Sequence, residues 1–160
     1  MIIVMILFPF LMMGQKMSNK KIDQIIATEC DSIEGVIGAW QFKLMDRPMF
    51  CFTDESNNRM RIICPIAIVE KLDEEMIYDA MIANFHSALD VKYAISDEVM
   101  WSVFIHPLKE LSTVQFKDAL KQVYNAAESF GTTYASTDLF FPGNRGSGKK
   151  EKDPIPTRKM

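Results

Sequence analysis

The chain has 160 residues, a formal net charge of −3 and a hydrophobic content of 48%, with 11 Phe and 12 Met. This is enough apolar material for one domain with an ordinary core, which excludes the fibrous and disordered classes of protein. Residues 17–141 hold 11 basic and 19 acidic side chains. Such an acidic body repels the phosphates of DNA and RNA, which argues against a nucleic-acid-binding body.

The amino end, MIIVMILFPFLMMG, is apolar over its first thirteen residues. It is shorter than the ~20 residues that cross a bilayer. It also lacks the basic start and the small-residue cleavage site of a secretory signal. Three interpretations stay open: a mis-assigned start codon, a weak export or membrane-anchoring segment, and a structured extension. We therefore treat residues 1–16 as a leader that is separate from the domain.

A helix is predicted directly after the leader, over residues 19–31. Ser18 or Asn19 is a suitable N-cap, because both side chains accept hydrogen bonds from free backbone N–H groups at a helix start. The apolar residues recur at helical spacing. They are Ile22, Ile25, Ile26, Cys30 and Ile33.

The apolar period then falls to two, which is typical of strands with one buried face. Arg59 and Arg61 are expected to point outward from the third strand. Pro65 lacks a backbone N–H and indicates a sheet edge or a strand end. The alternating segments predict an antiparallel meander of three strands, at residues 38–46, 49–54 and 59–68.

A second helix is predicted to begin at Asp73, whose side chain can cap it, with Leu72 packing onto Ile77. Its apolar stripe is wide enough for a buried or partner-facing helix. The stripe consists of Ile77, Tyr78, Met81, Ile82, Phe85 and Leu89.

Two more strands, DVKYAIS and VMWSVFIHPL, are followed by a third helix. A capping box at Ser112 and Gln115 marks the start of that helix, and Gly131 marks its end. The predicted fold is therefore α+β: a twisted antiparallel sheet of about five strands with three helices, in the order α-β-β-β-α-β-β-α.

The strand at residues 99–106 has two different faces, because successive side chains point to opposite sides. One face, predicted to be the core face, carries Val99, Trp101, Val103 and Ile105. The other is apolar with polar breaks and is predicted to meet a partner. It carries Met100, Ser102, Phe104 and His106.

No catalytic motif accompanies the two histidines, so we predict that the chain is not an enzyme and holds no metal or cofactor. His106 is predicted to end its strand, bonded to a nearby backbone group. His86 shares a helix face with Glu75 and Asp79, which is predicted to be a solvated polar face. The three cysteines are predicted to be reduced and to act as small buried hydrophobic residues. They are Cys30, Cys51 and Cys64.

The carboxyl end, PGNRGSGKKEKDPIPTRKM, is rich in Gly, Pro and Lys and almost free of apolar residues. It cannot bury enough surface to offset its ordering entropy. We predict a disordered basic tail over residues 142–160 and one folded domain over residues 17–141. Such a tail is either a solvated chain end or a contact for acidic surfaces.

The run from NFHSALDVKYAI through WSVFIHPLKEL to FKDALKQVYNAAESFGTTYAS resembles the type III secretion chaperone-like family, of the Tir-chaperone kind. It is also similar to the related YbjN-like proteins. With the strands at Phe50 and at Arg61–Pro65, the resemblance covers roughly residues 18–141. The residues that carry it are Asn84-Phe85, Tyr93-Ala94-Ile95, Trp101, His106-Pro107-Leu108, Asn125 and Phe130-Gly131-Thr132.

The resemblance implies a non-enzymatic, cytoplasmic homodimer that holds a client protein segment in extended form. It carries over no catalytic residue. The family dimerises around the second helix, so Ile77, Met81 and Phe85 are the predicted dimer interface. Met100 and Phe104 are then the predicted client-binding residues.

The apolar leader and the basic tail depart from the family pattern, and a second function therefore stays open. This is a YbjN-like fold relative with a regulatory or envelope-stress role. The leader, where genuine, makes such a protein membrane-associated or exported.

Overall fold

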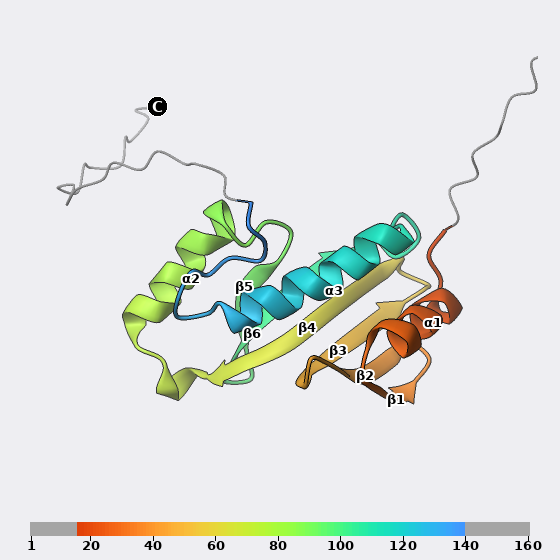
Figure 1. Cartoon of the computed structure of the whole chain (residues 1–160), viewed down its shortest axis with the longest axis horizontal. Coiled ribbons are helices and arrows are strands. Elements are labelled where there is room, and N and C mark those ends of the chain that lie inside the picture. The colour runs from red at the N-terminus through yellow and green to blue at the C-terminus, as the bar shows by residue number, and fades with distance from the viewer. Residues whose placement is uncertain (1–15, 140–160) are drawn as a thin grey trace, which may run out of the picture.

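The computed structural model describes residues 16–139, which form one antiparallel sheet with three α-helices (Figure 1). The predicted α+β class and the predicted order of helices and strands are confirmed, with one strand more than the five expected. Most of the predicted leader and all of the predicted tail lie outside the described residues. The elements are α1 (Asn19–Glu29), β1 (Ser32–Val36), β2 (Ala39–Leu44), β3 (Arg47–Asp54), β4 (Arg59–Ile68), the short 3₁₀ helix η1 (Val69–Lys71), α2 (Glu74–His86), β5 (Lys92–Ser96), β6 (Val99–His106) and α3 (Thr113–Glu128).

The strands lie in the order β1-β2-β3-β4-β6-β5. The additional strand is β1, which pairs with β2 from Ser32 opposite Lys43 to Val36 opposite Ala39. The sequence pattern does not predict it, because all of its residues are exposed. Gly35 has φ of +103°, and a Cβ there would lie 2.4 Å from the carbonyl oxygen of Ala39. Only glycine fits at this end of the strand.

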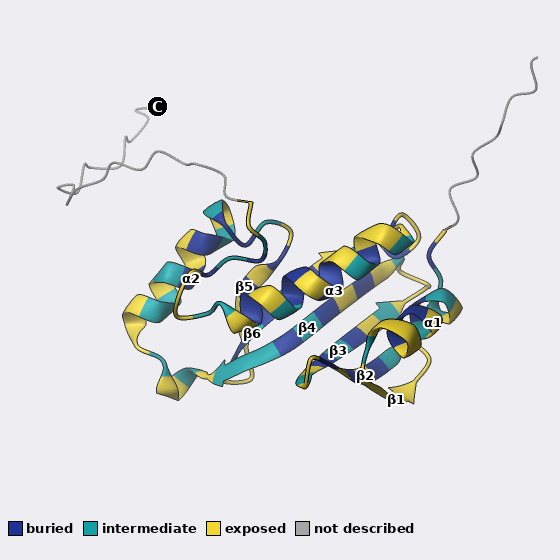
Figure 2. Cartoon of the chain, viewed as in Figure 1, coloured by how far each residue is buried: buried dark blue, intermediate teal, exposed yellow. Residues whose placement is uncertain are grey.

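Two helices cover one face of the sheet, which we call the inner face. α3 packs on β4 and β6, and α1 packs beside β1 and against α3 (Figure 1). α2 packs against β5, at the edge of the sheet. Figure 2 shows buried residues recurring along the strands beneath α3. Within residues 16–139 no helix covers the opposite face, which we call the outer face.

The core lies between the inner face and the helices, as the alternating pattern of the first two predicted strands indicates. Trp40, Phe42 and Leu44 of β2 are buried, as are Met49 and Cys51 of β3. α1 buries the predicted Ile22, Ile25 and Ile26, whereas Ile33 of the predicted stripe lies outside α1 and is exposed on β1. Asp23 of α1 accepts a hydrogen bond from the Trp40 indole at 2.8 Å. This bond satisfies a ring N–H that burial would otherwise leave without water.

Side-chain caps fix where α2 and α3 begin, and both were predicted. The Asp73 carboxylate accepts a hydrogen bond from the N–H of Met76 at 2.8 Å. Ser112 and Gln115 form the reciprocal capping box at the start of α3. Each cap satisfies donors that the first helical turn leaves free. α1 differs, because its N-cap residue Ser18 makes no side-chain capping bond.

The strand β5 forms one edge of the sheet, and α2 occupies part of that edge. Asn84 of α2 donates from Nδ2 to the carbonyl oxygen of Tyr93 at 3.1 Å and accepts from its N–H at 2.7 Å. A single side chain thus satisfies both outward backbone groups of Tyr93. This contact gives Asn84, which was singled out with the family resemblance, a structural role.

Candidate protein-binding surfaces

The outer face is the largest set of apolar side chains on the sheet that no described helix covers. Cross-strand pairing aligns its members in rows, with Phe52 and Ile105 flanking Arg61 in one row and Phe50, Ile63 and Val103 forming the next. We define the outer face by Phe50, Phe52, Ile63, Pro65, Trp101, Val103 and Ile105, all of which are half-buried or exposed.

Aromatic contacts give this face a rigid centre. The rings of Phe50 and Phe52 stack with centroids 6.4 Å apart, and the Trp101 ring meets Phe50 edge-on at 6.3 Å. The Trp101 indole N–H donates to the carbonyl oxygen of Ser96 at 3.1 Å. Large aromatic rings that are already ordered in the free protein offer contact area and lose little side-chain entropy when a partner binds, which favours binding.

The predicted assignment of the two faces of β6 is wrong. Met100 is 2% exposed and Phe104 is 6% exposed, and both belong to the core on the inner face. The polar break that suggested an outward face is Ser102, which is fully buried and donates from Oγ to the carbonyl oxygen of Val123 in α3 at 2.8 Å. Met100 and Phe104 are therefore not available to a client, whereas Trp101 and Ile105 of the same strand are.

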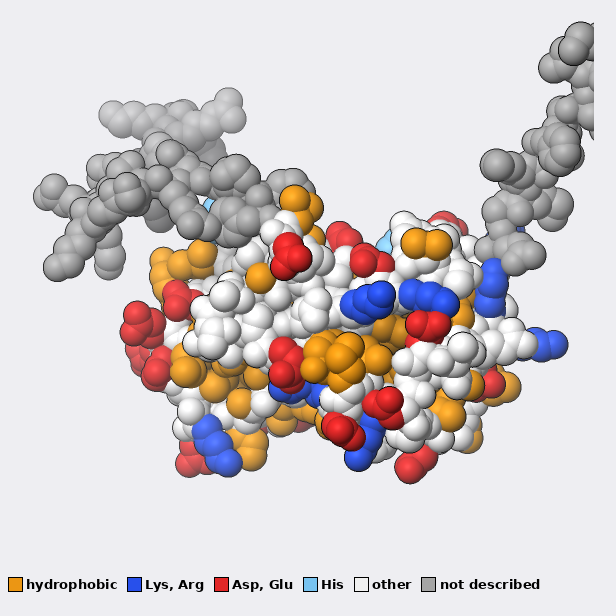
Figure 3. All heavy atoms as spheres, viewed as in Figure 1, with side chains coloured by type: hydrophobic (Ala, Val, Ile, Leu, Met, Phe, Trp, Pro, Cys, Tyr) orange, Lys and Arg blue, Asp and Glu red, His pale blue; other side chains and the backbone are white. Residues whose placement is uncertain are grey.

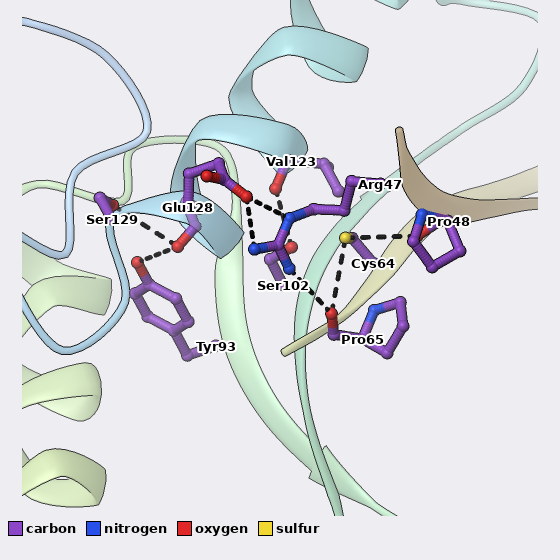
Figure 4. A network of polar contacts seen from close by, with 10 residues as sticks. Arg47, Pro48, Cys64, Pro65, Tyr93, Ser102, Val123, Glu128 and Ser129 are labelled. Carbon is purple, nitrogen blue, oxygen red and sulfur yellow. Dashed lines mark hydrogen bonds and ion pairs between the residues drawn. The ribbon is translucent and has the colours of Figure 1, made fainter. Parts of the chain in front are cut away.

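A network of polar contacts stabilises the part of the sheet where β4 has no backbone partner in β3 (Figure 4). This part lies beneath one end of the outer face. The ladder between β3 and β4 ends at Ile63, and the following part of β4 pairs with β6 alone. Pro65 lies there, beside a break in the register with β6. The prediction of a sheet edge at Pro65 is therefore correct on the β3 side, although β4 is an interior strand.

Arg47 spans this unpaired part of the sheet. Its guanidinium donates to the carbonyl oxygen of Pro65 at 3.3 Å and forms an ion pair with Glu128 of α3. The Cys64 thiol donates to the carbonyl oxygen of Pro48 at 3.4 Å. These contacts replace the backbone ladder that two prolines prevent. They hold Pro65, and with it the edge of the aromatic cluster, in place.

A second exposed apolar surface lies on α2. Met81 is 67% exposed and Phe85 is 81% exposed, while the small residues Ala80 and Ala83 of the same helix are buried. Tyr78 and Ile82 are also exposed. We call Tyr78, Met81, Ile82 and Phe85 the α2 face. Hydrophobic side chains lie at the surface in this part of the molecule, next to acidic ones (Figure 3).

The third residue of the predicted dimer interface lies elsewhere. Ile77 is half-buried and packs against the core. The predicted stripe therefore does not form one face, because Ile77 points toward the core and the α2 face points toward solvent. An exposed cluster of four large apolar side chains on one helix is uncommon unless something covers it.

His106 and the cysteines have structural surroundings. The Nδ1 atom of His106 lies 2.8 Å from the carbonyl oxygen of Pro107, and its ring stacks on Phe104. The prediction of a strand-end residue bonded to backbone is confirmed. The cysteines are free thiols. Burial raises the pKa of the Cys30 thiol to about 12 and that of Cys64 to about 11, so both stay neutral at physiological pH.

The described residues offer neither a metal site nor a membrane-spanning helix. No group of three or more His, Cys, Asp or Glu side chains in residues 16–139 is arranged to hold a metal ion. Among the helices of the same residues, none is long and apolar enough to cross a bilayer.

Comparison with known proteins shows similarity of structure only. No family model matches the chain, and no curated protein matches its sequence. The chain is similar to the chaperone in the HopA1–SchA chaperone–effector complex, with a TM-score of 0.53 and 10% identity over 68% of this chain and 88% of that chain. It is also similar to the Yersinia pestis type III secretion chaperone SycH, solved in complex with a stable fragment of YscM2. There the TM-score is 0.52 and the identity 12%, over 68% of this chain and 95% of that chain. The fold is therefore that of type III secretion chaperones.

Proposed function

We propose that this protein is a non-enzymatic, cytoplasmic, chaperone-like binding module that holds an extended segment of a client protein. The observation that carries the proposal is the outer face, an apolar sheet surface with an aromatic centre that no described helix covers. The structural similarity supports it, because both solved relatives are chaperones in complex with an effector or a protein fragment.

The geometry of the outer face suits an extended segment. Such a segment can direct alternate side chains onto a sheet surface. Along β6 the available side chains Trp101, Val103 and Ile105 recur at every second residue. The other strands add further apolar rows beside them. Because these side chains are already ordered within a sheet, the entropy lost on binding falls mainly on the client.

The α2 face is proposed to form a homodimer. It lies at the β5 edge of the sheet, so a second copy of the chain there leaves the outer face open to a client. A stable interface buries about 800 Å² on each partner. Four large exposed side chains on one helix, with neighbouring residues, offer an apolar centre for such an area.

The alternative is a YbjN-like regulatory or envelope-stress role on the same fold. That role requires no client segment. It therefore allows the same homodimer through the α2 face, but it predicts no partner whose binding requires the outer face.

The test is capture of a client by the outer face. The full chain, a double variant with Trp101→Asp and Val103→Asp, and a control with Val114→Asp are used as baits in an extract of the source cells. Val114 is 76% exposed and lies on α3, away from both proposed surfaces. The proposal expects a partner that the full chain and the control retain at near-equal amounts and the double variant loses, measured by quantitative mass spectrometry. Equal recovery by all three baits would contradict a client site on this face.

A further inference from the structure

Arg61 is a charged residue in the middle of an apolar surface. Cross-strand pairing places it between Phe52 of β3 and Ile105 of β6. Both neighbours are exposed, and Ile105 is 59% exposed. Among the residues that the structure describes, none forms an ion pair or hydrogen bond with the Arg61 guanidinium.

A hollow of about 480 Å³ opens beside Arg61 on the outer face. Arg59 lines the same hollow, and Phe52 and Ile105 supply apolar walls. Arg59 donates to the carbonyl oxygen of its neighbour Asn58 at 3.2 Å, which leaves further N–H groups of its guanidinium for a ligand. Two cationic side chains and several apolar ones thus surround one space.

One acid also lines the hollow, namely Asp54. Its carboxylate accepts hydrogen bonds from the hydroxyl of Ser56 at 2.5 Å and from the backbone and side-chain N–H groups of Asn57 at 2.9 Å and 2.6 Å. These donors hold the pKa of Asp54 well below its ordinary value, so the carboxylate stays charged and committed to its own turn. One negative charge against two positive ones leaves the hollow with a net positive charge.

We propose that the outer face selects client segments that carry an acidic side chain among apolar ones, with the carboxylate bound by Arg61. This inference rests on the proposed function and specifies the chemistry of the client. Because Arg61 stands in the same row as Phe52 and Ile105, the acidic residue of the client faces the sheet and lies between these two apolar side chains of the protein.

The selection follows from desolvation as much as from attraction. A purely apolar segment laid over this row removes water from Arg61 and gives its guanidinium no partner, which is unfavourable. A carboxylate in that place forms charge-assisted hydrogen bonds that match the planar guanidinium. Arg61 therefore disfavours purely apolar segments and favours segments that carry a carboxylate.

Other charges on the outer face do not compete for the ligand. Lys92 donates from Nζ to the carbonyl oxygen of Asn84 at 2.9 Å, at the β5 edge. Lys43 lies on β2 opposite Pro48, outside the row of Arg61. Nucleic acid is the alternative anion, since exposed aromatic rings with arginines also suit single strands. The net charge of −3 opposes long anionic polymers and favours a peptide with a single acid.

The experiment uses three fluorescent peptides of twelve residues in which Leu or Phe alternates with Ser and one central Leu is replaced by Glu, Gln or Lys. Binding to the full chain is measured by fluorescence anisotropy. We expect the Glu peptide to bind about tenfold more tightly than the Gln peptide, and the Lys peptide to bind most weakly. Arg61→Gln should remove the advantage of Glu without weakening the Gln peptide. Arg61→Lys should restore part of it.

Lys43→Gln is the matched control, because it removes the same charge from the same face outside the hollow. It should leave the order of the peptides unchanged, and Trp101→Ala should weaken all three. Equal binding of the Glu and Gln peptides would overturn acid selection and leave the proposed function intact. Failure of every peptide to bind would overturn both. Tighter binding of a twenty-nucleotide oligothymidylate than of the Glu peptide would assign the hollow to nucleic acid instead.

Discussion

Cys64 is a residue whose protonation is linked to the stability of the fold. Its thiol is fully buried and donates to Pro48 across the unpaired part of the sheet. Burial raises its pKa from 9.0 to about 11, and the nearby Arg47 guanidinium opposes this rise without cancelling it. The folded protein therefore holds the proton more tightly than the unfolded chain does.

The sign of the resulting pH dependence follows from linkage. A raised pKa in the folded state gives a contribution that is complete below pH 9.0 and is lost as the pH rises toward about 11. We expect Cys64→Ala to lower the free energy of unfolding at pH 8, and this loss to shrink as the pH approaches 11. Urea unfolding in the presence of a reductant measures the difference. A difference that stays constant with pH would contradict the assigned environment.

A single residue, Ser102, explains the main error of the prediction from sequence, which exchanged the two faces of β6. Alternation in β6 correctly separates Trp101, Val103 and Ile105 from Met100 and Phe104, but both sets are apolar, so their composition does not identify the buried one. The deciding contact is the bond from the Ser102 hydroxyl to the backbone of α3. A buried serine that a helix carbonyl satisfies is indistinguishable in sequence from an exposed one.

At the scale of elements, local signals predicted most of the fold. The caps at Asp73 and Ser112 and the period-two strands concern residues close in the chain, so their pattern is visible in the sequence. β1 was missed because its order comes from pairing with β2, not from its own composition. The orientation of α2 was predicted only in part, because Ile77 packs inward with Ala80 and Ala83. The other large side chains of the predicted stripe on this helix are exposed, namely Tyr78, Met81, Ile82 and Phe85.

The exposed side of α2 leads to a prediction about assembly. Met81→Glu places a charge in the proposed apolar contact between two copies, where it would lose water without gaining a partner. Light scattering should give twice the chain mass of 18.3 kDa for the full chain and a lower mass for Met81→Glu. Met45→Glu is the control, since Met45 is also exposed but lies in the turn between β2 and β3. A full chain that is monomeric at tens of micromolar would refute the proposed interface.

At the scale of the whole molecule, the question is which part of the chain is the cooperative unit. Met17 is 2% exposed and belongs to the core, so the cooperative unit begins no later than this residue. We propose that residues 17–141 are sufficient for folding. A chain shortened to these residues should melt in one transition within a few degrees of the full chain, as measured by circular dichroism. Loss of cooperative melting would show that one of the two ends belongs to the fold.

The uncovered sheet has a consequence for the behaviour of the protein in solution. A surface that accepts an apolar segment of another protein also attracts the same surface on a second copy. The acidic excess of residues 17–141 opposes this by keeping like-charged molecules apart. Dissolved salt shortens the reach of that repulsion to about 8 Å at physiological ionic strength. The solubility of the protein without a client thus depends on charge repulsion between copies at long range. Binding of a client depends on direct contacts at short range.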